Sequence, residues 1–432
     1  MEIIKSWEDG FDEALNRIAN RGRIGRADVE ASARNIINQV KEKGDEAVIK
    51  FTKKFDNYHL SPENIKVSGE EIENAYASID KKILEHLKLA AERIKKFHEH
   101  QVEKSWSYKE EGILLGQIIR PLAIVGVYAP GGKASYPSSV LMNVIPAKVA
   151  GVKKVIMCTP ASAGRLNPYV LAAADIVGVD EIFCIGGTQA IAAMAYGTET
   201  IPKVDKIVGP GNIYVAEAKR MVFGDVDIDM VAGPSEILVI ADKSARADFI
   251  AADLLSQAEH DEMAYPLLIT DSLDLAENVI REIDNQKKSL GRSEIIDNCL
   301  KNNCVCFIVK GLSEGINLAN KIAPEHLELM MDSPENLIDK IENAGAIFLG
   351  KFTPEAVGDY AAGPNHVLPT GGTARFFSPL GVYDFIKRSS LISFSEKNLK
   401  DIAVVVKNIA EVEGLIAHAN AVDIRIRTKE KD

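Results

Sequence analysis

The sequence predicts an α/β protein built on parallel sheets. From about residue 113 onward, short apolar runs alternate with stretches long enough to hold a crossover helix, and Gly, Pro or Asp bounds each run. This alternation is typical of parallel βαβ units. We expect strands at residues 124–128, 155–158, 181–185, 206–208, 237–241, 267–270, 305–309 and 346–349.

The first hundred residues are predicted to be helical instead. Apolar residues recur there at spacings of three and four, for example at Phe11, Leu15 and Ile18, as they do on one face of a helix. The pattern breaks near residue 56, and Ser61-Pro62 is a suitable start for the next helix.

Composition limits the class of protein. The chain has 432 residues and a net charge of −11, enough sequence for two or three domains. The acidic balance and the lack of a basic block argue against a nucleic-acid partner, and no apolar run approaches the roughly 20 residues of a membrane span. The first residues lack the apolar segment of an export signal. The five cysteines are odd in number and lack a Cys-x-x-Cys pair, so we expect reduced thiols in a cytoplasmic enzyme.

Glycine-rich turns follow three of the predicted strands, at residues 130–132, 186–187 and 209–211. A glycine turn that leads into a helix forms an anion site, because the first turn of the helix has unpaired N–H groups. The fingerprint G-x-G-x-x-G is absent, so this block is at most an incomplete Rossmann-like unit. The residues leave two interpretations open, a nucleotide cleft or glycines that serve only tight turns.

The following block has acidic and histidine-bearing turns. Gln257 and His260 are three residues apart in a segment that we expect to be helical from about Arg246, so both side chains should project from one face. Zinc accepts imidazole and carboxylate ligands, and the loop around Asp359 and His366 could supply more of them. The alternative is a polar pair on the surface of a helix.

A carboxylate stands beside an imidazole in Pro324-Glu325-His326, just before an apolar run. At the entrance of a strand, this pair could act as a general acid and base, with the glutamate activating water. The alternative is a helix-ending turn with two exposed polar residues.

Four further histidines lie among lysines and glutamates in the helical region and are expected to face solvent: His59, His86, His98 and His100.

Longer motifs in this order resemble the histidinol dehydrogenase family. They are VGPGNIYV at 208–215, AGPSE at 232–236, DLLSQAEHD at 253–261, APEHL at 323–327 and AGPNHVLPTGG at 362–372, with Glu413-Gly414 and Ala417-His418 near the end. The resemblance spans about 300 residues from near Arg120 to His418, and the helical N-terminus fits the family pattern.

The resemblance implies a set of site residues. It implies one zinc ion per subunit, held by Gln257, His260, Asp359 and His418, and NAD contacts at Tyr128, Gln189 and Asn212. It implies catalysis by Glu325 and His326. Substrate contacts would fall on Ser235, His326, His366, Glu413 and the four zinc ligands. The family also implies a homodimer with intertwined C-terminal tails, in which Glu413 and His418 complete the site of the neighbouring subunit.

The implied reaction is the last step of histidine biosynthesis. L-Histidinol is oxidised through L-histidinal to L-histidine while two NAD molecules are reduced in succession, with His326 as the base and Glu325 activating water. A related dehydrogenase acting on another small alcohol, such as a sulfonate-bearing diol, is the alternative; it would need Arg or Lys where Glu413 and His366 stand. A zinc hydrolase would not need the glycine turns, and a mere binding module would not need Glu325-His326.

These observations predict how the chain divides. We expect a helical N-terminal extension at 1–24, a main α/β domain at 25–127 and 235–378 with the zinc and acid/base residues, and an inserted NAD-binding α/β domain at 128–234. A C-terminal tail domain at 379–432 would follow, with a frayed charged end. The predicted fold is thus two parallel-sheet domains, one inserted in the other, with small helical pieces at both ends.

Overall fold

The computed structural model describes residues 1–21, 27–131, 136–161 and 165–427. These residues form two compact units, of which the first comprises Met1–Gln101 and Leu122–Phe385 and the second comprises Val102–Pro121 and Ile386–Asp432. The first unit contains two parallel sheets flanked by helices. The predicted α/β class with two parallel-sheet domains is confirmed, and all eight predicted strands are present to within two residues at each end.

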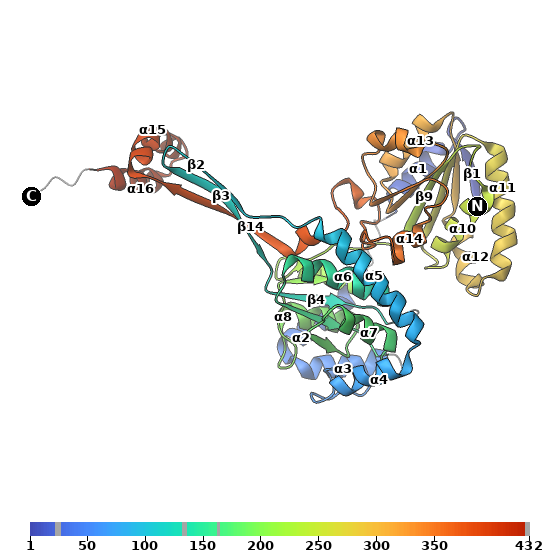
Figure 1. Cartoon of the computed structure of the whole chain (residues 1–432), viewed down its shortest axis with the longest axis horizontal. Coiled ribbons are helices and arrows are strands. Elements are labelled where there is room, and N and C mark those ends of the chain that lie inside the picture. The colour runs from blue at the N-terminus through green and yellow to red at the C-terminus, as the bar shows by residue number, and fades with distance from the viewer. Residues whose placement is uncertain (22–26, 132–135, 162–164, 428–432) are drawn as a thin grey trace, which may run out of the picture. The chain divides into compact units, whose positions relative to one another are not determined.

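A five-stranded parallel sheet forms one half of the first unit (Figure 1). Its order is β6-β5-β4-β7-β8, so the chain moves outward from β4 in both directions. The strands are β4 (Ile124–Tyr128), β5 (Lys154–Cys158), β6 (Glu181–Phe183), β7 (Lys206–Val208) and β8 (Asp227–Ile228). The connecting helices are α6 (Pro137–Ala150), α7 (Pro168–Ile176), α8 (Gly187–Tyr196) and α9 (Ile213–Val222). Parallel pairing places the turns that follow β4, β6 and β7 at one edge of the sheet.

The N-terminal helices pack on this five-stranded half. They are α2 (Ala27–Lys43), α3 (Asp45–Asp56), α4 (Gly69–Ser78) and α5 (Lys81–Glu99). Helix α2 contacts α8 and α9, while α4 and α5 contact α7 and α6, and all share one hydrophobic core with the sheet. The sequence analysis grouped residues 25–127 with 235–378. In the structure these helices pack on the five-stranded sheet instead, because their apolar faces are buried against the block that carries the glycine turns.

For one histidine of these helices, the predicted exposure to solvent is wrong. His98 in α5 is fully buried rather than solvent-facing, whereas His59, His86 and His100 are exposed as expected. Its Nδ1 lies 2.8 Å from the carbonyl oxygen of Ile94, and its Nε2 lies 3.3 Å from Nδ2 of Asn365. Both ring nitrogens therefore have partners inside the core, which is the condition for burying a polar side chain.

A six-stranded parallel sheet forms the other half of the first unit. Its order is β1-β11-β10-β9-β12-β13. The strands are β1 (Glu2–Lys5), β9 (Glu236–Ala241), β10 (Tyr265–Thr270), β11 (Val305–Ile308), β12 (His326–Met330) and β13 (Ala346–Leu349). Because β1 pairs in parallel with β11, the N-terminal segment is part of this sheet and not a separate helical extension.

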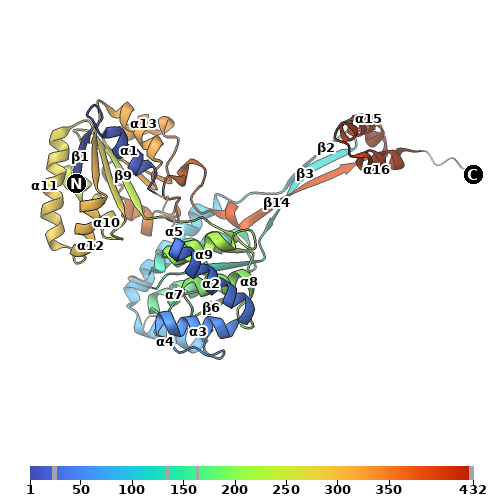
Figure 2. The same cartoon turned by 180° about the vertical axis from the view of Figure 1, so that it is seen from behind.

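Helices cover both faces of the six-stranded sheet (Figures 1 and 2). One face packs against α10 (Ala247–Ala258), α11 (Leu273–Gln286) and α12 (Ser293–Asn302), and the other against α1 (Phe11–Ala19) and α13 (Leu312–Ile322). Ile237 and Val239 belong to the first core and Leu238 to the second, because successive side chains of a strand point to opposite faces. The remaining short elements are α14 (Glu355–Tyr360), η1 (Lys287–Ser289), η2 (Pro334–Lys340), η3 (Thr373–Arg375) and η4 (Val382–Phe385).

The second unit is a three-stranded antiparallel sheet followed by two helices. The sheet order is β14-β3-β2, with β2 (Trp106–Glu110), β3 (Ile113–Pro121) and β14 (Ile386–Phe394). The helices are α15 (Glu396–Val412) and α16 (Ile416–Ile426). The predicted tail domain at 379–432 therefore omitted residues 102–121, which supply two of the three strands. Its predicted frayed end, residues 427–432, lies outside the described residues except for Arg427.

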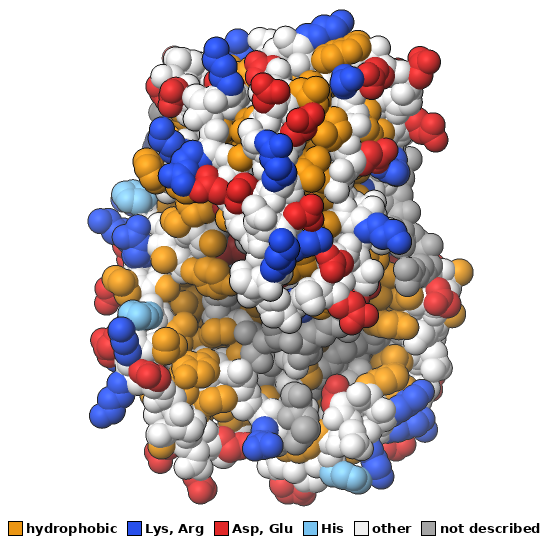
Figure 3. Space-filling view, turned by 90° about the vertical axis from the view of Figure 1, so that its right-hand side faces the viewer, with side chains coloured by type: hydrophobic (Ala, Val, Ile, Leu, Met, Phe, Trp, Pro, Cys, Tyr) orange, Lys and Arg blue, Asp and Glu red, His pale blue; other side chains and the backbone are white. Residues whose placement is uncertain are grey.

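Two surface properties bear on the class of protein. None of the helices in the described part of the chain combines the length and the apolar character of a membrane span. On the face drawn in Figure 3, Lys and Arg side chains are interspersed with Asp and Glu side chains. That face therefore has no extended basic patch of the kind that binds a nucleic-acid backbone.

Candidate active site

A cavity of about 920 Å³ lies in the first unit, and turns of both parallel sheets line it. Ten of the twelve site residues predicted from the sequence are among its lining residues: Tyr128, Gln189, Asn212, Ser235, Gln257, His260, Glu325, His326, Asp359 and His366. The glycine turns and the histidine-bearing turns are far apart in the chain. The tertiary structure thus gathers the two blocks around one space of a size suited to a small-molecule ligand.

The glycine turns form one wall of the cavity. Gly209, after β7, has a φ of +116°, and a Cβ there would overlap the carbonyl oxygen of Tyr128. Only glycine combines this backbone conformation with so close an approach of two chain segments. The side-chain oxygen of Asn212 caps α9 by accepting from the N–H groups of Tyr214 and Val215, at 3.0 and 3.1 Å.

Two polar side chains of this wall suit a nucleotide ligand. Gln189 is 1% exposed, and neither its oxygen nor its nitrogen has a hydrogen-bond partner among the described residues. The hydroxyl of Tyr128 accepts from the N–H of Gly187 at 3.1 Å, and burial raises the pKa of that hydroxyl to about 12. The neutral phenol and the free amide both remain able to bind a ligand, which argues against glycines that serve only tight turns.

Glu325 and His326 also line the cavity, at the point where the chain passes from α13 to β12. They are 6% and 4% exposed, so the alternative of an exposed helix-ending turn is wrong. The Nδ1 of His326 lies 2.8 Å from the carbonyl oxygen of Glu236, which must accept a hydrogen bond and so places the ring proton on Nδ1. The Nε2 atom has no partner among the described residues. Burial lowers the pKa of His326 to about 4, so the ring is a neutral base.

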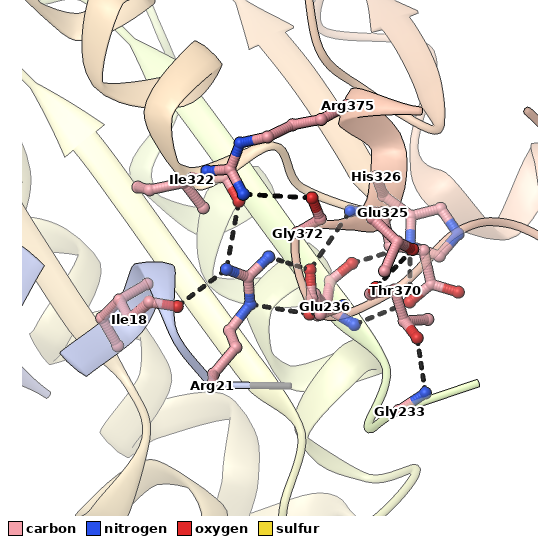
Figure 4. Close-up of polar contacts among 12 residues, drawn as sticks. Ile18, Arg21, Gly233, Glu236, Ile322, Glu325, His326, Thr370, Gly372 and Arg375 are labelled. Atoms are coloured by element: carbon pink, nitrogen blue, oxygen red, sulfur yellow. Dashed lines mark hydrogen bonds and ion pairs between the residues drawn. The ribbon is translucent and has the colours of Figure 1, made fainter. Parts of the chain in front are cut away.

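The carboxylate of Glu325 is held at one oxygen. Its Oε2 accepts a hydrogen bond from the N–H of Glu236 at 2.8 Å, and its own N–H donates to the carboxylate of Glu236 at 3.3 Å (Figure 4). Burial, and next the charge of Glu236, raise the pKa of Glu325 well above its usual range. A carboxylate with a raised pKa is a stronger base than an ordinary glutamate, which suits it to take a proton from water.

A group of possible metal ligands lies beside this pair. Ligand atoms of His260, Glu355 and Asp359 all lie within 4.8 Å of one another. The neighbouring Gln257 is fully buried, and neither polar atom of its side chain has a partner among the described residues. Helix α10 ends at Ala258, so His260 sits in the turn after the helix and not on its regular face as we expected. Gln257 is buried, and His260 is only partly exposed and lines the cavity, so the two residues are not a polar pair on the surface of a helix.

The electrostatics of this group favour a bound cation. Burial raises the pKa of Asp359 to about 6, and burial with repulsion from Asp359 and Glu325 raises the pKa of Glu355 well above its usual range. Burial lowers the pKa of His260, so the ring is neutral and its lone pair is free. Neutral imidazole, carboxylate and amide oxygen are ligands that zinc accepts. A divalent cation would also offset the repulsion between the carboxylates.

Glu355 and Ser139 are among the lining residues that sequence reasoning missed. Glu355 begins α14, four residues before Asp359 and so on the same helical face, a spacing that could have revealed it. Ser139, near the start of α6, has its hydroxyl 3.4 Å from Nε2 of His366, and no local signal marks it. His366 Nδ1 lies 3.0 Å from the carbonyl oxygen of Asp359.

The other two predicted residues belong to the second unit. Glu413 caps the C-terminus of α15, and His418 lies in α16; both are exposed. The buried hydrophobic residues of α15 and α16 are only Ala403, Ala410 and Ala419, while larger apolar side chains of these helices are exposed: Val404, Val405, Ile409, Val412, Ile416 and Ile424. The five cysteines are free, as predicted, and none of them is among the described residues that line the cavity.

Comparisons with known proteins agree on one family. The family model described as histidinol dehydrogenase matches residues 19–426. A histidinol dehydrogenase of Bacillus cereus is 54% identical over 429 residues, covering 98% of this chain and 99% of the relative. One of Aquifex aeolicus is 55% identical over 425 residues, with the same coverage. The crystal structure of histidinol dehydrogenase from Elizabethkingia anophelis superposes with a TM-score of 0.93 at 38% identity, covering 99% of this chain and 98% of that one.

Proposed function

This chain belongs to the histidinol dehydrogenase family, and we propose that it oxidises L-histidinol through L-histidinal to L-histidine in two successive hydride transfers to NAD. It is an oxidoreductase of histidine biosynthesis. One observation supports this proposal above the others. The buried pair Glu325-His326 faces the same cavity as the possible metal ligands and the glycine turns.

Zinc and NAD fit the residues of the cavity. Gln257, His260 and Asp359 would hold the zinc ion together with the partner subunit's His418, and the bound ion would fix the imidazole and amino nitrogens of the substrate. Tyr128, Gln189 and Asn212 would hold NAD, which accepts a hydride in each oxidation. The unpartnered amides of Gln189 and Gln257 support both assignments, because buried polar atoms normally have partners.

The hydrogen bonds support separate roles for His326 and Glu325. With its proton fixed on Nδ1, His326 takes the hydroxyl proton of histidinol at Nε2 as the hydride leaves the carbon. Glu325 then takes a proton from the water that attacks the aldehyde. Protonation of the former aldehyde oxygen completes the hydrate. The hydrate then transfers the hydride of its reacting carbon, the second of the overall reaction, while a base removes a hydroxyl proton, which leaves the carboxylic acid. Ser235 and His366 would line the pocket for the substrate.

The alternative substrate, a sulfonate-bearing diol, suits this cavity less well. Lys219 is the one Lys or Arg among the described lining residues, and its ammonium is paired with Asp229 and donates to the carbonyl oxygen of Gly209 at 2.9 Å. Glu325, Glu355 and Asp359 are among the other lining residues. A sulfonate would meet these carboxyl groups without a free cation, whereas the amine and imidazole of histidinol are compatible with them.

We also propose a cytoplasmic homodimer with intertwined second units, in which Glu413 and His418 complete the partner's site. The exposed valines and isoleucines of α15 and α16 support a covered surface, because contiguous apolar surface usually marks an interface. Mixing His326→Asn with His418→Ala protein tests the sharing of sites. Each variant alone should be nearly inactive, and re-formed mixed dimers should regain up to about a quarter of the parent activity if sites are shared. No recovery after verified exchange of subunits would contradict the shared site.

The first experiment is NADH formation from L-histidinol by the zinc-loaded protein. Two NADH should form per histidine. His326→Asn should slow the first oxidation, and Glu325→Gln should most impair the oxidation of added L-histidinal. If another small alcohol reacted and histidinol did not, the substrate assignment would be wrong.

A further inference from the structure

Arg21 and Glu236 form a buried ion pair next to the acid/base residues. Arg21, just after α1, contacts the carboxylate of Glu236 with two nitrogens: Nε lies 2.7 Å from Oε1, and an Nη atom contacts Oε2. The two side chains are 0% and 1% exposed. The other Nη atom of Arg21 donates to the carbonyl oxygens of Ile18 and Ile322, at 2.7 and 3.1 Å. Arg21 therefore ties the ends of α1 and α13 to the first residue of β9 (Figure 4).

Glu236 contacts both acid/base residues. Its backbone N–H donates to Oε2 of Glu325, and its carbonyl oxygen lies 2.8 Å from Nδ1 of His326. Its carboxylate accepts from the N–H of Glu325 and, at 2.6 Å, from the N–H of Gly371. The four donors to this carboxylate are thus two nitrogens of Arg21 and two backbone groups next to or within the active site.

Stability alone is a weak reason for such a pair. Removing two charges from water is costly, and an apolar pair of similar volume is often equally stable. Neither Arg21 nor Glu236 is among the described residues that line the cavity, so neither is placed to touch the substrate. What the pair does provide is a fixed backbone on both sides of Glu325, whose carbonyl oxygen is also held by the N–H of Ala346 at 2.9 Å.

We propose that Arg21 and Glu236 are positioning residues for the water-activating step. They hold Oε2 of Glu325 against β9, and the other oxygen, which has no hydrogen-bond partner among the described residues, is left for the attacking water. The imidazole of His326 is held with its proton on Nδ1 by the backbone carbonyl oxygen of Glu236, which side-chain substitutions at Arg21 and Glu236 retain. The proposal rests on the proposed role of Glu325, and a misplacement of about 1 Å at a reacting group costs on the order of 10²-fold in rate.

The test separates the two oxidations in full-length, zinc-loaded protein. The variants are Glu236→Gln, Arg21→Met and Arg21→Lys, with Glu325→Gln as the reference for lost water activation. The first oxidation is measured as NADH formed in a single turnover of L-histidinol, and the second as kcat and KM for added L-histidinal. Zinc content and the urea midpoint are measured for each variant.

We expect kcat for histidinal to fall about 30- to 100-fold in Glu236→Gln and Arg21→Met, with KM within threefold and zinc content unchanged. The rate of the first oxidation should fall by a factor at least five times smaller than the factor by which kcat for histidinal falls. Arg21→Lys keeps the positive charge but loses the bidentate contact with the carboxylate. Its kcat for histidinal should therefore lie between those of the parent and Arg21→Met. Val279→Ala is the matched control, because Val279 is fully buried in α11 against the same sheet and outside the cavity. It should lower the urea midpoint without changing the ratio of the two rates.

Each other result has a definite meaning. Parent-like histidinal oxidation in Glu236→Gln and Arg21→Met, with Glu325→Gln impaired, would overturn the positioning role and leave the role of Glu325 intact. If Glu325→Gln were also unimpaired, the proposed role of Glu325 would fail first. Equal loss of both oxidations, or failure of all three variants to fold, would assign the pair to stability and overturn the proposal.

Discussion

The close approach of Gly209 to Tyr128 predicts a large effect of one added methyl group. In Gly209→Ala, a φ of +116° becomes strained, at about 1–3 kcal/mol for a side chain in a sparsely populated region. The new Cβ also overlaps the carbonyl oxygen of Tyr128, and forcing atoms into a packed site costs roughly a further 1–3 kcal/mol. The turn cannot easily move away, because Asp229 accepts from its N–H at 2.8 Å and Lys219 donates to its carbonyl oxygen.

Gly224→Ala separates the two contributions. Gly224 has a φ of +103°, but a Cβ there meets no atom within 4 Å, so only the backbone strain applies. Urea titration should show a lower free energy of unfolding in both variants. The decrease should be larger in Gly209→Ala than in Gly224→Ala by about 1–3 kcal/mol. Because the turn lines the proposed NAD site, the dissociation constant for NAD should rise about tenfold in Gly209→Ala, equivalent to about 1.4 kcal/mol, and stay unchanged in Gly224→Ala. Equal stability of the two variants would refute the steric argument, and unchanged NAD affinity would refute the placement of the cofactor.

Three further predictions concern buried polar groups. Gln257→Met should stabilise the metal-free protein by about 1–2 kcal/mol, because it removes an unpaired buried amide. The same variant should lose the rise in Tm that zinc causes in the parent, and a retained rise would contradict the assignment of Gln257 as a ligand. Lys219→Met leaves the carboxylate of Asp229 buried without its cation and should cost about 3–5 kcal/mol in urea unfolding, whereas Lys400→Met, at an exposed pair with Glu396, should leave the midpoint unchanged. Burial lowers the pKa of His98 in the folded state, so its contribution to stability is present above its unfolded pKa of about 6.5 and is lost as the pH falls below it. Removing that titration in His98→Met should make the urea midpoint less sensitive to pH between 7.5 and 5.5, and an unaltered pH dependence would count against a neutral buried ring.

Short local motifs indicated several of the candidate site residues. The spacings of Gln257 and His260, and of Glu325 and His326, marked them as candidates, because a helix turn or a strand entrance places neighbouring side chains in predictable directions, and all four line one cavity. The surface alternatives could be excluded only with the structure, since burial depends on what packs over a segment. His98 is the opposite case, because its polar neighbours in sequence indicated solvent while Asn365, 267 residues away, completes its buried hydrogen bonds.

The parallel α/β class, the glycine turns and the residue types of the candidate acid/base and ligand motifs can be predicted from the sequence, because these depend on periodicity and spacing along a few turns of chain. The structure was needed to show that α2–α5 pack on the five-stranded sheet, that β3 pairs with β14, and that Arg21 contacts Glu236, 215 residues away. Such contacts depend on the packing of complete surfaces and on the need of every buried polar group for a partner. Those demands are met by residues far apart in the chain, so no local pattern indicates which ones meet.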